Sequence, residues 1–252
     1  MIEEDDWVLI YFDKRRRYTI KVKKSKIFHT DKGVIYLDSL IGKNYGSRLS
    51  TNIGCNFVLA KPSFLDLLET FSRRTQIIYL KDASLIIALA SIGSGSIVVE
   101  GGTGSGFLTA FLANFVKPEG RVYTYDTNRY FQKIAEKNIA SINLSKYVFF
   151  KNKDITKGID EEDVDAVILD IPNPWDVVKH AYNALKNGGV FICFLPTINQ
   201  IEKTVIELEN LPFIDINTYE TFLRHYKVSK GATRPMAPMI AHTGFIISAK
   251  KP

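Results

Sequence analysis

The chain alternates strand and helix patterns from Ile97 onward, and this alternation restricts the possible folds more than any other feature. The runs IVVE, RVYTYD, DAVILD and GGVFICFLP are typical of buried strands, and a helical pattern follows each. A further strand, YVFFKNKD, precedes the third of them. Strands that alternate with helices predict a parallel sheet covered by helices. The last stretches, FIDINTYETF and HTGFIISAK, lack a clear helix between them and predict a terminal antiparallel pair.

The N-terminal part follows a different pattern. Over residues 7–59, short alternating stretches such as WVLIYF and YTIKV are broken by Gly, Asp and Asn, which indicates a small all-β unit. A helical pattern over residues 82–90 starts at Asp82, which we expect to act as its N-cap. The sequence therefore predicts an α/β protein with two domains, a β domain over residues 1–62 and a larger domain over residues 63–252.

Composition excludes several classes of protein. With 46% hydrophobic and 24% charged residues, and no uncharged apolar run near 18 residues, the chain is expected to be globular and not membrane-spanning. Its start, MIEEDDWVLI, is acidic where a secretory signal would be basic. Cys55 and Cys193 make no metal or disulfide framework, and no HExxH or paired zinc ligands occur. We therefore expect a cytoplasmic protein without a metal site.

Basic residues are concentrated in two places. The formal net charge is +6, and eight of the thirteen residues in KRRRYTIKVKKSK, from Lys14 to Lys26, are basic. A second group near the C-terminus comprises Arg224, His225, Lys227, Lys230 and Arg234. Two such clusters suit a nucleic-acid partner, because binding then releases counterions from the phosphates. The alternative for each cluster is an ordinary solvated face.

A glycine-rich turn, EGGTGSG, connects the strand that starts at Ile97 to the helix that follows it. Glycines let the backbone approach a ligand closely, and the helix N-terminus supplies free N–H groups. Asp126 follows the last glycine by 20 residues, at the end of the next strand, where an acid can accept both hydroxyls of a ribose. A dinucleotide motif would need glycine at 107 or 109, but these positions hold Phe107 and Thr109.

This turn resembles the first motif of class I S-adenosylmethionine-dependent methyltransferases. The resemblance implies S-adenosylmethionine as cofactor and a Rossmann-like, mostly parallel sheet of seven strands. In such enzymes an acid after the third strand accepts from the adenine amino group of the cofactor, and Asp154-Ile155 stands there. The resemblance thus implies a cofactor site made of Glu100, Gly101, Gly102, Thr103, Gly104, Ser105, Gly106, Asp126, Asp154, Ile155 and Asp170.

Further segments resemble one family, the tRNA adenine-N1 methyltransferases that modify the T-loop. They are TQIIYLKD, EGGTGSGFLTAFLA, LDIPNPW, LKNGGVFICFLPTINQ and RPMAPMIAHTGF, and they span about Thr75 to Lys250. The family tends to have Pro at Leu80, Glu at Asp126 and Gly at Lys153, and none of these departures removes a needed functional group. Membership implies a small N-terminal β domain, tRNA as partner, a homotetramer, and methylation of adenine 58, with 57 as a second candidate.

Asp170 is the candidate catalytic residue. In AVILDIPNPW it follows an apolar strand and precedes two prolines that stiffen the loop. Adenine N1 needs no base, but its methylated product is a cation. A carboxylate that accepts from the N6 amino group would orient N1 and stabilise the developing charge. A turn-forming or helix-capping aspartate is the alternative.

Other residues are candidates for contacts with the substrate. The resemblance suggests that Tyr79 contacts the target base and takes part in catalysis, and a packed tyrosine is the alternative. Asn173 belongs to the same loop as Asp170, and Arg234 is a candidate phosphate contact. His242 and Thr243 would come near the active face if the tail strand runs back beside the pocket.

Two other functions remain open at this point. Another class I methyltransferase, acting on protein isoaspartate or a small molecule, would share the glycine turn but leaves the basic clusters and DIPNPW without a purpose. A non-catalytic tRNA-binding subunit would retain the fold without the chemistry. Degenerate glycines or a missing Asp170 would favour that second alternative, and both are intact.

Overall fold

A computed structural model describes all residues from Met1 to Pro252, which form two compact units. The first unit covers residues 1–71 and the second covers residues 72–252. Helix α1 (Phe64–Glu69) belongs to the first unit. The two units are described separately below.

The first unit is built from short antiparallel strands, as the alternating pattern predicts. Its four-stranded sheet has the order β2-β1-β6-β5, and β3 and β4 form a separate hairpin. Val8, Ile10 and Leu59 are fully buried in its core. Its elements are β1 (Trp7–Asp13), β2 (Arg16–Lys21), β3 (Ile27–Thr30), β4 (Gly33–Tyr36), the 3-10 helix η1 (Leu37–Leu40), β5 (Arg48–Ser50), β6 (Asn56–Ala60) and α1.

The second unit contains a seven-stranded sheet with the order β12-β15-β11-β10-β7-β8-β9. The five strands β11, β10, β7, β8 and β9 are parallel, and β15 runs antiparallel between β11 and β12. This mostly parallel sheet and the terminal antiparallel pair confirm the expected fold class. The strands are β7 (Ile97–Gly101), β8 (Arg121–Tyr125), β9 (Val148–Lys151), β10 (Val164–Leu169), β11 (Leu185–Leu195), β12 (Ile214–Tyr219) and β15 (Phe245–Lys250).

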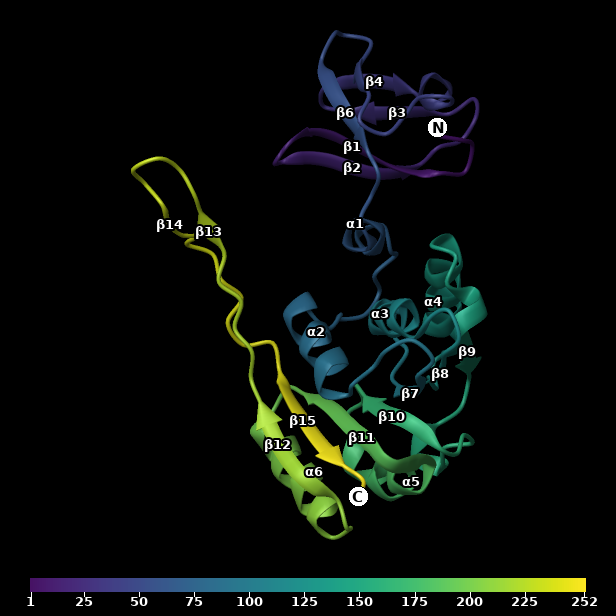
Figure 1. The fold of residues 1–252 in the computed structure, drawn as a ribbon, viewed down its shortest axis with the longest axis vertical. Coiled ribbons are helices and arrows are strands. Elements are labelled where there is room, and N and C mark those ends of the chain that lie inside the picture. Colours follow the sequence, from purple (N-terminus) through teal and green to yellow (C-terminus); the bar gives the residue numbers. More distant parts are fainter. The chain divides into compact units, whose positions relative to one another are not determined.

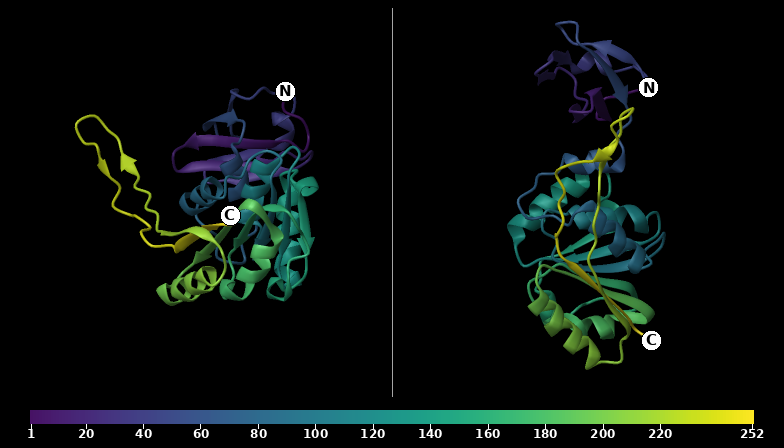
Figure 2. Two further views of the ribbon diagram at one scale, coloured as in Figure 1. Left: turned by 60° about the horizontal axis from the view of Figure 1, so that its bottom comes forward. Right: turned by 90° about the vertical axis from the view of Figure 1, so that its left-hand side faces the viewer.

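Helices cover both faces of this sheet (Figures 1 and 2). On one face lie α2 (Leu80–Leu89), α3 (Phe107–Val116) and α4 (Arg129–Ser141). On the other lie α5 (Val178–Ala184) and α6 (Ile198–Glu209). Short 3-10 helices η2 (Ser145–Tyr147), η3 (Ile155–Lys157) and η4 (Pro174–Val177) complete the connections. No helix is both long and apolar enough to cross a membrane.

Residues 220–244, which we call the arm, leave the sheet between β12 and β15 and extend away from it as a hairpin (Figure 2). The arm includes two short paired strands, β13 (Tyr226–Lys227) and β14 (Arg234–Pro235). Large apolar side chains are exposed along it, namely Phe222, Leu223, Tyr226, Val228, Met236 and Ile240. The alternating strand and helix pattern gave no indication of this hairpin.

The expected helix near Asp82 begins earlier than predicted. Helix α2 starts at Leu80 with Tyr79 as its N-cap, so the prediction that Asp82 caps it is wrong. Asp82 is fully buried, and its carboxylate accepts hydrogen bonds from the side chains of Lys81, Thr221 and Thr243. Hydroxyls from the ends of the arm thus take the place of the backbone N–H groups that a cap would bind.

The strand order brings the predicted site together. Strands β10, β7 and β8 are neighbours in the sheet and parallel, so their carboxyl ends meet at one edge. Asp170, the glycine turn and Asp126 directly follow these three strands. In open α/β sheets this edge is where ligands bind.

Candidate active site

A cleft of about 250 Å³ lies at the carboxyl ends of the parallel strands. It is formed by the loops that follow β7, β8, β9 and β10. Of the residues predicted for the site, it is lined by Gly102, Asp126, Asp154, Ile155, Asp170 and Asn173. Long-range folding therefore places six separately predicted residues around one cavity.

Gly102 allows the ends of β7 and β10 to approach each other. Its φ is +96°, and a Cβ built on it would lie 2.2 Å from the carbonyl oxygen of Asp170. Its N–H donates to the carbonyl of Tyr125 at 2.9 Å, and the N–H of Asp170 donates to the carbonyl of Gly101 at 2.8 Å. The backbone at Gly102 leaves no room for a side chain. The floor of the cleft at this point is therefore formed by backbone atoms alone.

Asp126 is held by backbone donors. One carboxylate oxygen accepts from the N–H of Gly104 at 2.9 Å, and the other accepts from the N–H of Asn128 at 2.7 Å. Gly104 has a φ of +52° and Gly106, the N-cap of α3, has a φ of +80°. The glycine turn therefore fixes the position of the acid that is expected to bind a ribose.

Thr103 and Ser105 hold the turn and do not line the cleft. The hydroxyls of Thr103 and Thr124 lie 2.6 Å apart and share a hydrogen bond. The hydroxyl of Ser105 accepts from the N–H groups of Arg74 and Thr75, and its carbonyl accepts from the side chain of Asn138. Their contribution to a cofactor site would be to maintain the shape of the turn.

Glu100 lies beneath the glycine turn and is completely buried. One carboxyl oxygen accepts from the hydroxyls of Thr109 and Thr124, both at 2.6 Å, while the other has no hydrogen-bond partner. Burial raises the pKa of Glu100 to about 8, against the lowering effect of the two hydroxyls. The side chain thus ties β7 to α3 and β8 while leaving one polar atom unsatisfied.

Asp154 precedes η3 at the side of the cleft. One carboxylate oxygen accepts from the N–H of Thr156 at 2.9 Å and from its hydroxyl at 2.7 Å. These hydrogen bonds lower the pKa of Asp154, so it carries a negative charge at neutral pH. Ile155, the first residue of η3, gives the cleft an apolar wall beside this acid.

Asp170 presents a carboxylate that no other group of the protein binds. Its backbone N–H is used by Gly101, but no hydrogen bond or ion pair reaches its side-chain oxygens. The side chain is open to solvent within the cleft, yet protein surrounds it on most sides, and this burial raises its pKa to about 6. An acceptor without a partner, facing a cavity, is available to a ligand.

Three contacts hold the loop after Asp170. The side-chain amide of Asn173 donates to Asp176 at 2.6 Å, and the carbonyl of Pro172 accepts from Gln200 on α6 at 2.9 Å. Lys203, also on α6, lies 5.0 Å above the ring of Trp175. Trp175 therefore anchors the loop to α6.

The other predicted substrate contacts lie outside the cleft. Tyr79 lines a different cavity with residues of the arm, and Arg234 lies on β14 in the arm itself. His242 is bound to Glu220 at 2.7 Å, which raises its pKa, and Thr243 donates to Asp82 at 2.7 Å. The structure thus places the HTGF segment at the base of the arm.

Several residues of the cleft were not predicted from the sequence. Tyr125 and Lys153 line it, and the hydroxyl of Tyr125 donates to Glu161 at 2.5 Å. Because Tyr125 directly precedes Asp126, its position at a strand end was a usable signal. Lys81, which lines the other cavity beside Tyr79, gave no such signal in the sequence. Its partners Thr221 and Thr243 lie more than a hundred residues away along the chain.

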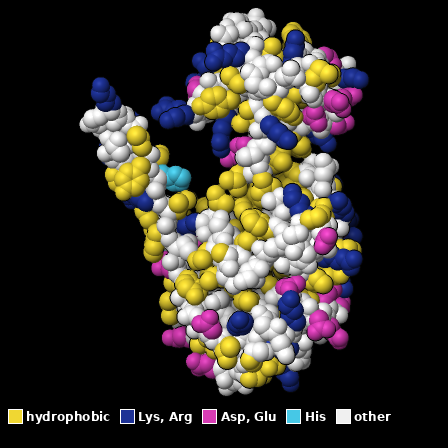
Figure 3. Space-filling model, viewed as in Figure 1, with side chains coloured by type: hydrophobic (Ala, Val, Ile, Leu, Met, Phe, Trp, Pro, Cys, Tyr) yellow, Lys and Arg dark blue, Asp and Glu magenta, His cyan; other side chains and the backbone are white.

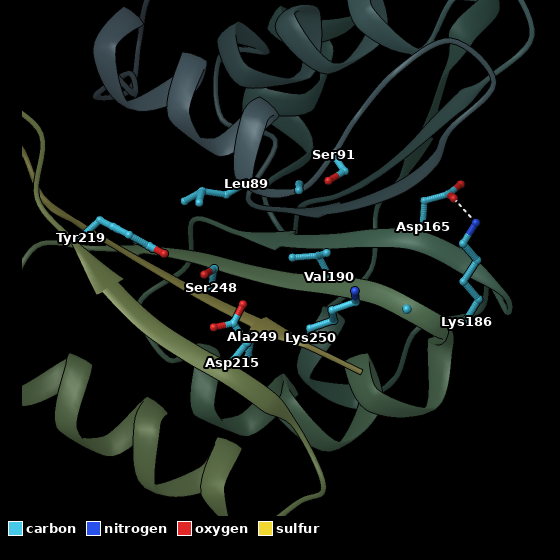
Figure 4. A pocket seen from close by; sticks show the side chains of 12 residues that line it. Leu89, Ser91, Asp165, Lys186, Val190, Asp215, Tyr219, Ser248, Ala249 and Lys250 are labelled. Carbon is cyan, nitrogen blue, oxygen red and sulfur yellow. Dashed lines mark ion pairs between the residues drawn. The ribbon is translucent and has the colours of Figure 1, made fainter. Parts of the chain in front are cut away.

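A second open groove lies at the opposite edge of the sheet (Figure 4). It has a volume of about 390 Å³ and is lined by the ends of strands and by the C-terminal end of α2. Asp165 and Lys186 form an ion pair there, and Asp165 also accepts from the N–H of Ile97 at 2.7 Å. No residue predicted for the site lies in this groove.

The cleft fits an adenosine-containing methyl donor. Two acids, Asp126 and Asp154, follow neighbouring strands, and the bare backbone at Gly102 leaves space between them and Asp170. The cleft has no cluster of cations that could bind a phosphate group. Lys153 is the only Lys or Arg in its lining, and it is paired with Asp160. Acidic groups and a glycine turn suit ribose hydroxyls, an adenine amino group and a sulfonium.

Comparison with protein families gives two matches. Residues 57–243 match the model described as the tRNA methyltransferase complex GCD14 subunit, and residues 1–48 match the TrmI-like N-terminal family. A relative from Methanocaldococcus jannaschii, named tRNA (adenine(57)-N(1)/adenine(58)-N(1))-methyltransferase TrmI, is 36% identical over 97% of this chain and 94% of its own length.

Solved structures agree with this similarity. A protein from Thermotoga maritima described as a SAM-dependent O-methyltransferase has a TM-score of 0.93 and 36% identity, covering 99% of this chain and 94% of that one. The tRNA (m1A58) methyltransferase TrmI from Aquifex aeolicus has a TM-score of 0.86 and 31% identity, covering 100% of this chain and 98% of that one.

The space at Gly102 leads to a first prediction. Gly102→Ala places a Cβ against the carbonyl of Asp170 in a left-handed conformation, so we expect a loss of about 2 kcal/mol or more of unfolding free energy. Methyl-donor affinity should fall at least tenfold. Gly95→Ala is a matched control, because Gly95 has a φ of +87° with nothing within 4 Å, and it should cost only about 1 kcal/mol. If urea unfolding shows equal losses of unfolding free energy for the two variants, the close approach of Gly102 to Asp170 does not have the role proposed for it.

The burial of Glu100 leads to a second prediction. Its folded-state pKa is raised, so the folded chain binds the proton more tightly than the unfolded chain does, and this stabilisation is lost as pH rises through about 8. Glu100→Gln removes the titration. Between pH 6 and pH 9, urea unfolding should therefore show a larger loss of unfolding free energy for the wild type than for the variant. Identical pH profiles would disprove the raised pKa of Glu100.

Proposed function

The chain belongs to the tRNA (adenine-N1)-methyltransferase family, of the archaeal and bacterial type, and we propose that its cleft carries out methylation of N1 of adenine 58 in the T-loop of tRNA. It is an S-adenosylmethionine-dependent enzyme of class I. The name of the Methanocaldococcus relative includes adenine 57 as well as adenine 58. We therefore propose adenine 57 as a second acceptor.

The cofactor site is assigned to the residues of the glycine turn and the strand ends. S-adenosylmethionine supplies an electrophilic methyl group when it is bound. Asp126 is positioned by Gly104 to accept from the ribose hydroxyls, and Asp154 retains one oxygen for the adenine amino group. Gly101 and Gly102 keep the cleft floor free of side chains. Glu100, Thr103, Ser105 and Gly106 support the turn from behind.

The unpartnered carboxylate of Asp170 is the observation that carries the proposed mechanism. It lines the same cleft as the cofactor residues, so a base held by it lies beside the methyl donor. Asp170 accepts from the N6 amino group of adenine, which aims N1 at the methyl group. Its negative charge then stabilises the cation formed on the ring. Asn173, in the same loop, contributes a side chain to the substrate side of the cleft.

The arm is the better candidate of the two basic clusters for contact with tRNA. Five of the eight cations in the N-terminal cluster form ion pairs within the protein, namely Arg16, Arg17, Lys21, Lys23 and Lys24. The arm cations Arg224, Lys227, Lys230 and Arg234 form none. Unpaired cations keep their charge available to phosphates. Tyr79, His242 and Thr243 are proposed to serve tRNA binding from the base of the arm.

For the target adenine to reach the cleft, the enzyme also needs the arm or a comparable cationic surface. A T-loop adenine is stacked within folded tRNA, and its extraction costs a few kcal/mol. Phosphate contacts along the arm would offset this cost. A cytoplasmic location, where tRNA is present, is part of the proposal.

A third prediction concerns Asp170. Asp170→Asn keeps the shape of the side chain but removes its charge, so we expect kcat to fall at least about 100-fold while S-adenosylmethionine affinity changes less than threefold. The readout is 1-methyladenosine released by nuclease digestion of unmodified tRNA after the reaction. Asp163→Asn makes the same change just before the other end of β10 and should leave the rate unaltered.

The same residue sets the pH dependence of the wild type. Protonation removes the negative charge of Asp170 that stabilises the cationic ring, so kcat/KM should fall about tenfold per pH unit below about 6. A flat profile down to pH 5 would contradict the role of the carboxylate. Methylated oxygen in the digest, in place of 1-methyladenosine, would instead support the acceptor class named for the Thermotoga structure.

We also propose a homotetramer. The arm exposes Phe222, Tyr226, Val228 and Met236, and apolar side chains on an extended hairpin are typically covered by another subunit. Figure 3 shows hydrophobic side chains along the arm and cations towards its tip.

A fourth prediction tests this assembly. Light scattering should give four times the chain mass of 28.5 kDa for the wild type. The double variant Val228→Ser/Met236→Ser should give a smaller assembly, because it removes apolar contact area without changing charge. A wild-type monomer, or an unchanged tetramer in the variant, would reject this role of the arm.

A further inference from the structure

A cavity of about 420 Å³ lies between the start of α2 and the base of the arm. Tyr79 and Lys81 form its inner side, and Leu223, Met239 and Ile240 from the two sides of the arm form its outer side. It shares no lining residue with the cleft that holds Asp170. The proposed reaction at Asp170 leaves this cavity without a function.

A buried polar network lies at the inner side of the cavity and includes Lys81, one of the lining residues. The ammonium of Lys81 donates to Asp82 at 2.8 Å, to Thr221 at 2.9 Å and to Thr243 at 2.5 Å. The two threonine hydroxyls donate in turn to Asp82, at 2.6 and 2.7 Å. The Lys81 side chain is only 8% exposed and Asp82 is 0% exposed, so the network is shielded from water. All three Lys81 donors and both Asp82 oxygens have partners.

This network connects both ends of the arm to the first turn of α2. Thr221 lies two residues before Leu223, and Thr243 lies three residues after Ile240. Fully satisfied buried networks specify one arrangement, because any shift leaves a charged group without a partner. The network therefore fixes the base of the arm against α2, on the side of the cavity where Lys81 lies.

The charge and composition of the walls indicate the kind of ligand. The lining is mostly apolar, and it includes the aromatic ring of Tyr79 and the imidazole ring of His225. The arm carries four Lys or Arg residues and one Glu, and none of the four cations is in an ion pair. Arg224 reaches across the arm to the sulfur of Met239 at 3.0 Å, so one guanidinium contacts a residue that lines the cavity. A flat ring for stacking beside unpaired cations suits a nucleotide of a single-stranded segment.

We propose that this cavity binds one unstacked nucleobase of the tRNA, a neighbour of the target adenine, with Tyr79 as its stacking surface. The proposal rests on the proposed function. The target adenine itself has to lie within hydrogen-bond reach of Asp170, which lines the cleft and not this cavity. A base bound here would hold the loop open while the adenine occupies the cleft, so the cavity would act in substrate recognition.

Ile240→Ser tests the protein side. Ile240 is 54% exposed, so the change should not unfold the chain, but it removes apolar surface from the cavity. We expect KM for tRNA to rise about tenfold, with kcat and S-adenosylmethionine affinity within twofold of the wild type. Ile206→Ser is the matched control, because Ile206 is 56% exposed on α6 and does not line the cavity. It should leave KM unchanged.

Abasic tRNAs test the ligand side. Transcripts that lack the base at single positions flanking the target adenine should include one position where KM rises about tenfold with the wild type. The same transcript should produce no further rise with Ile240→Ser, because the lost base and the lost wall belong to one interaction. If no flanking abasic site matters, or if the two effects multiply fully, the proposal is wrong.

Two controls separate this proposal from its alternatives. If Ile240→Ser changes the assembly mass in light scattering, the cavity is closed by a second copy of the chain and the nucleobase proposal is overturned. Fluorescence anisotropy with a labelled T-arm RNA, without cofactor, measures the cavity directly. If the wild type forms no 1-methyladenosine, the proposed function is rejected. Weaker binding of the labelled RNA by Ile240→Ser than by the wild type would still support the proposal for the cavity.

Discussion

The contact between the backbones of Gly102 and Asp170 is the constraint on which the site depends. Parallel pairing of β7 with β10 brings the two strand ends together, and only a residue without Cβ fits at Gly102. The same turn directs N–H groups to Tyr125 and Asp126 on the other side. The glycine turn therefore joins three strand ends, so the carboxylates of Asp126 and Asp170 share one cleft.

Residues at strand ends could be predicted from the sequence because strand position and topology together determine where they lie. Asp126 and Asp170 each follow a stretch with a strand pattern, and parallel neighbours end at one edge. The sequence gave no comparable rule for the arm. Asp82 looked like a helix cap, but hydroxyls from Thr221 and Thr243 reach its carboxylate across more than a hundred residues. Such contacts depend on tertiary packing, which local patterns do not contain.

Charge counting alone could not distinguish the two basic clusters. Both are dense in Lys and Arg, but acids elsewhere in the first unit neutralise much of the N-terminal cluster, with Asp5 alone pairing with Lys21 and Lys23. The arm has only Glu220 nearby in sequence, and that acid is bound to His242. Available charge is therefore a property of the fold, and it favours the arm as the surface that meets phosphates.

The two carboxylates with raised pKa differ in how many partners the protein gives them, and this difference separates structure from chemistry. Glu100 is enclosed and accepts from two threonine hydroxyls that tie it to α3 and β8. Asp170 has a raised pKa from burial alone and no side-chain partner. A carboxylate that lines a cleft and has no partner in the protein is a candidate for contact with a ligand. We therefore propose that the substrate supplies a partner for Asp170, because adenine carries an amino group beside the ring that becomes cationic.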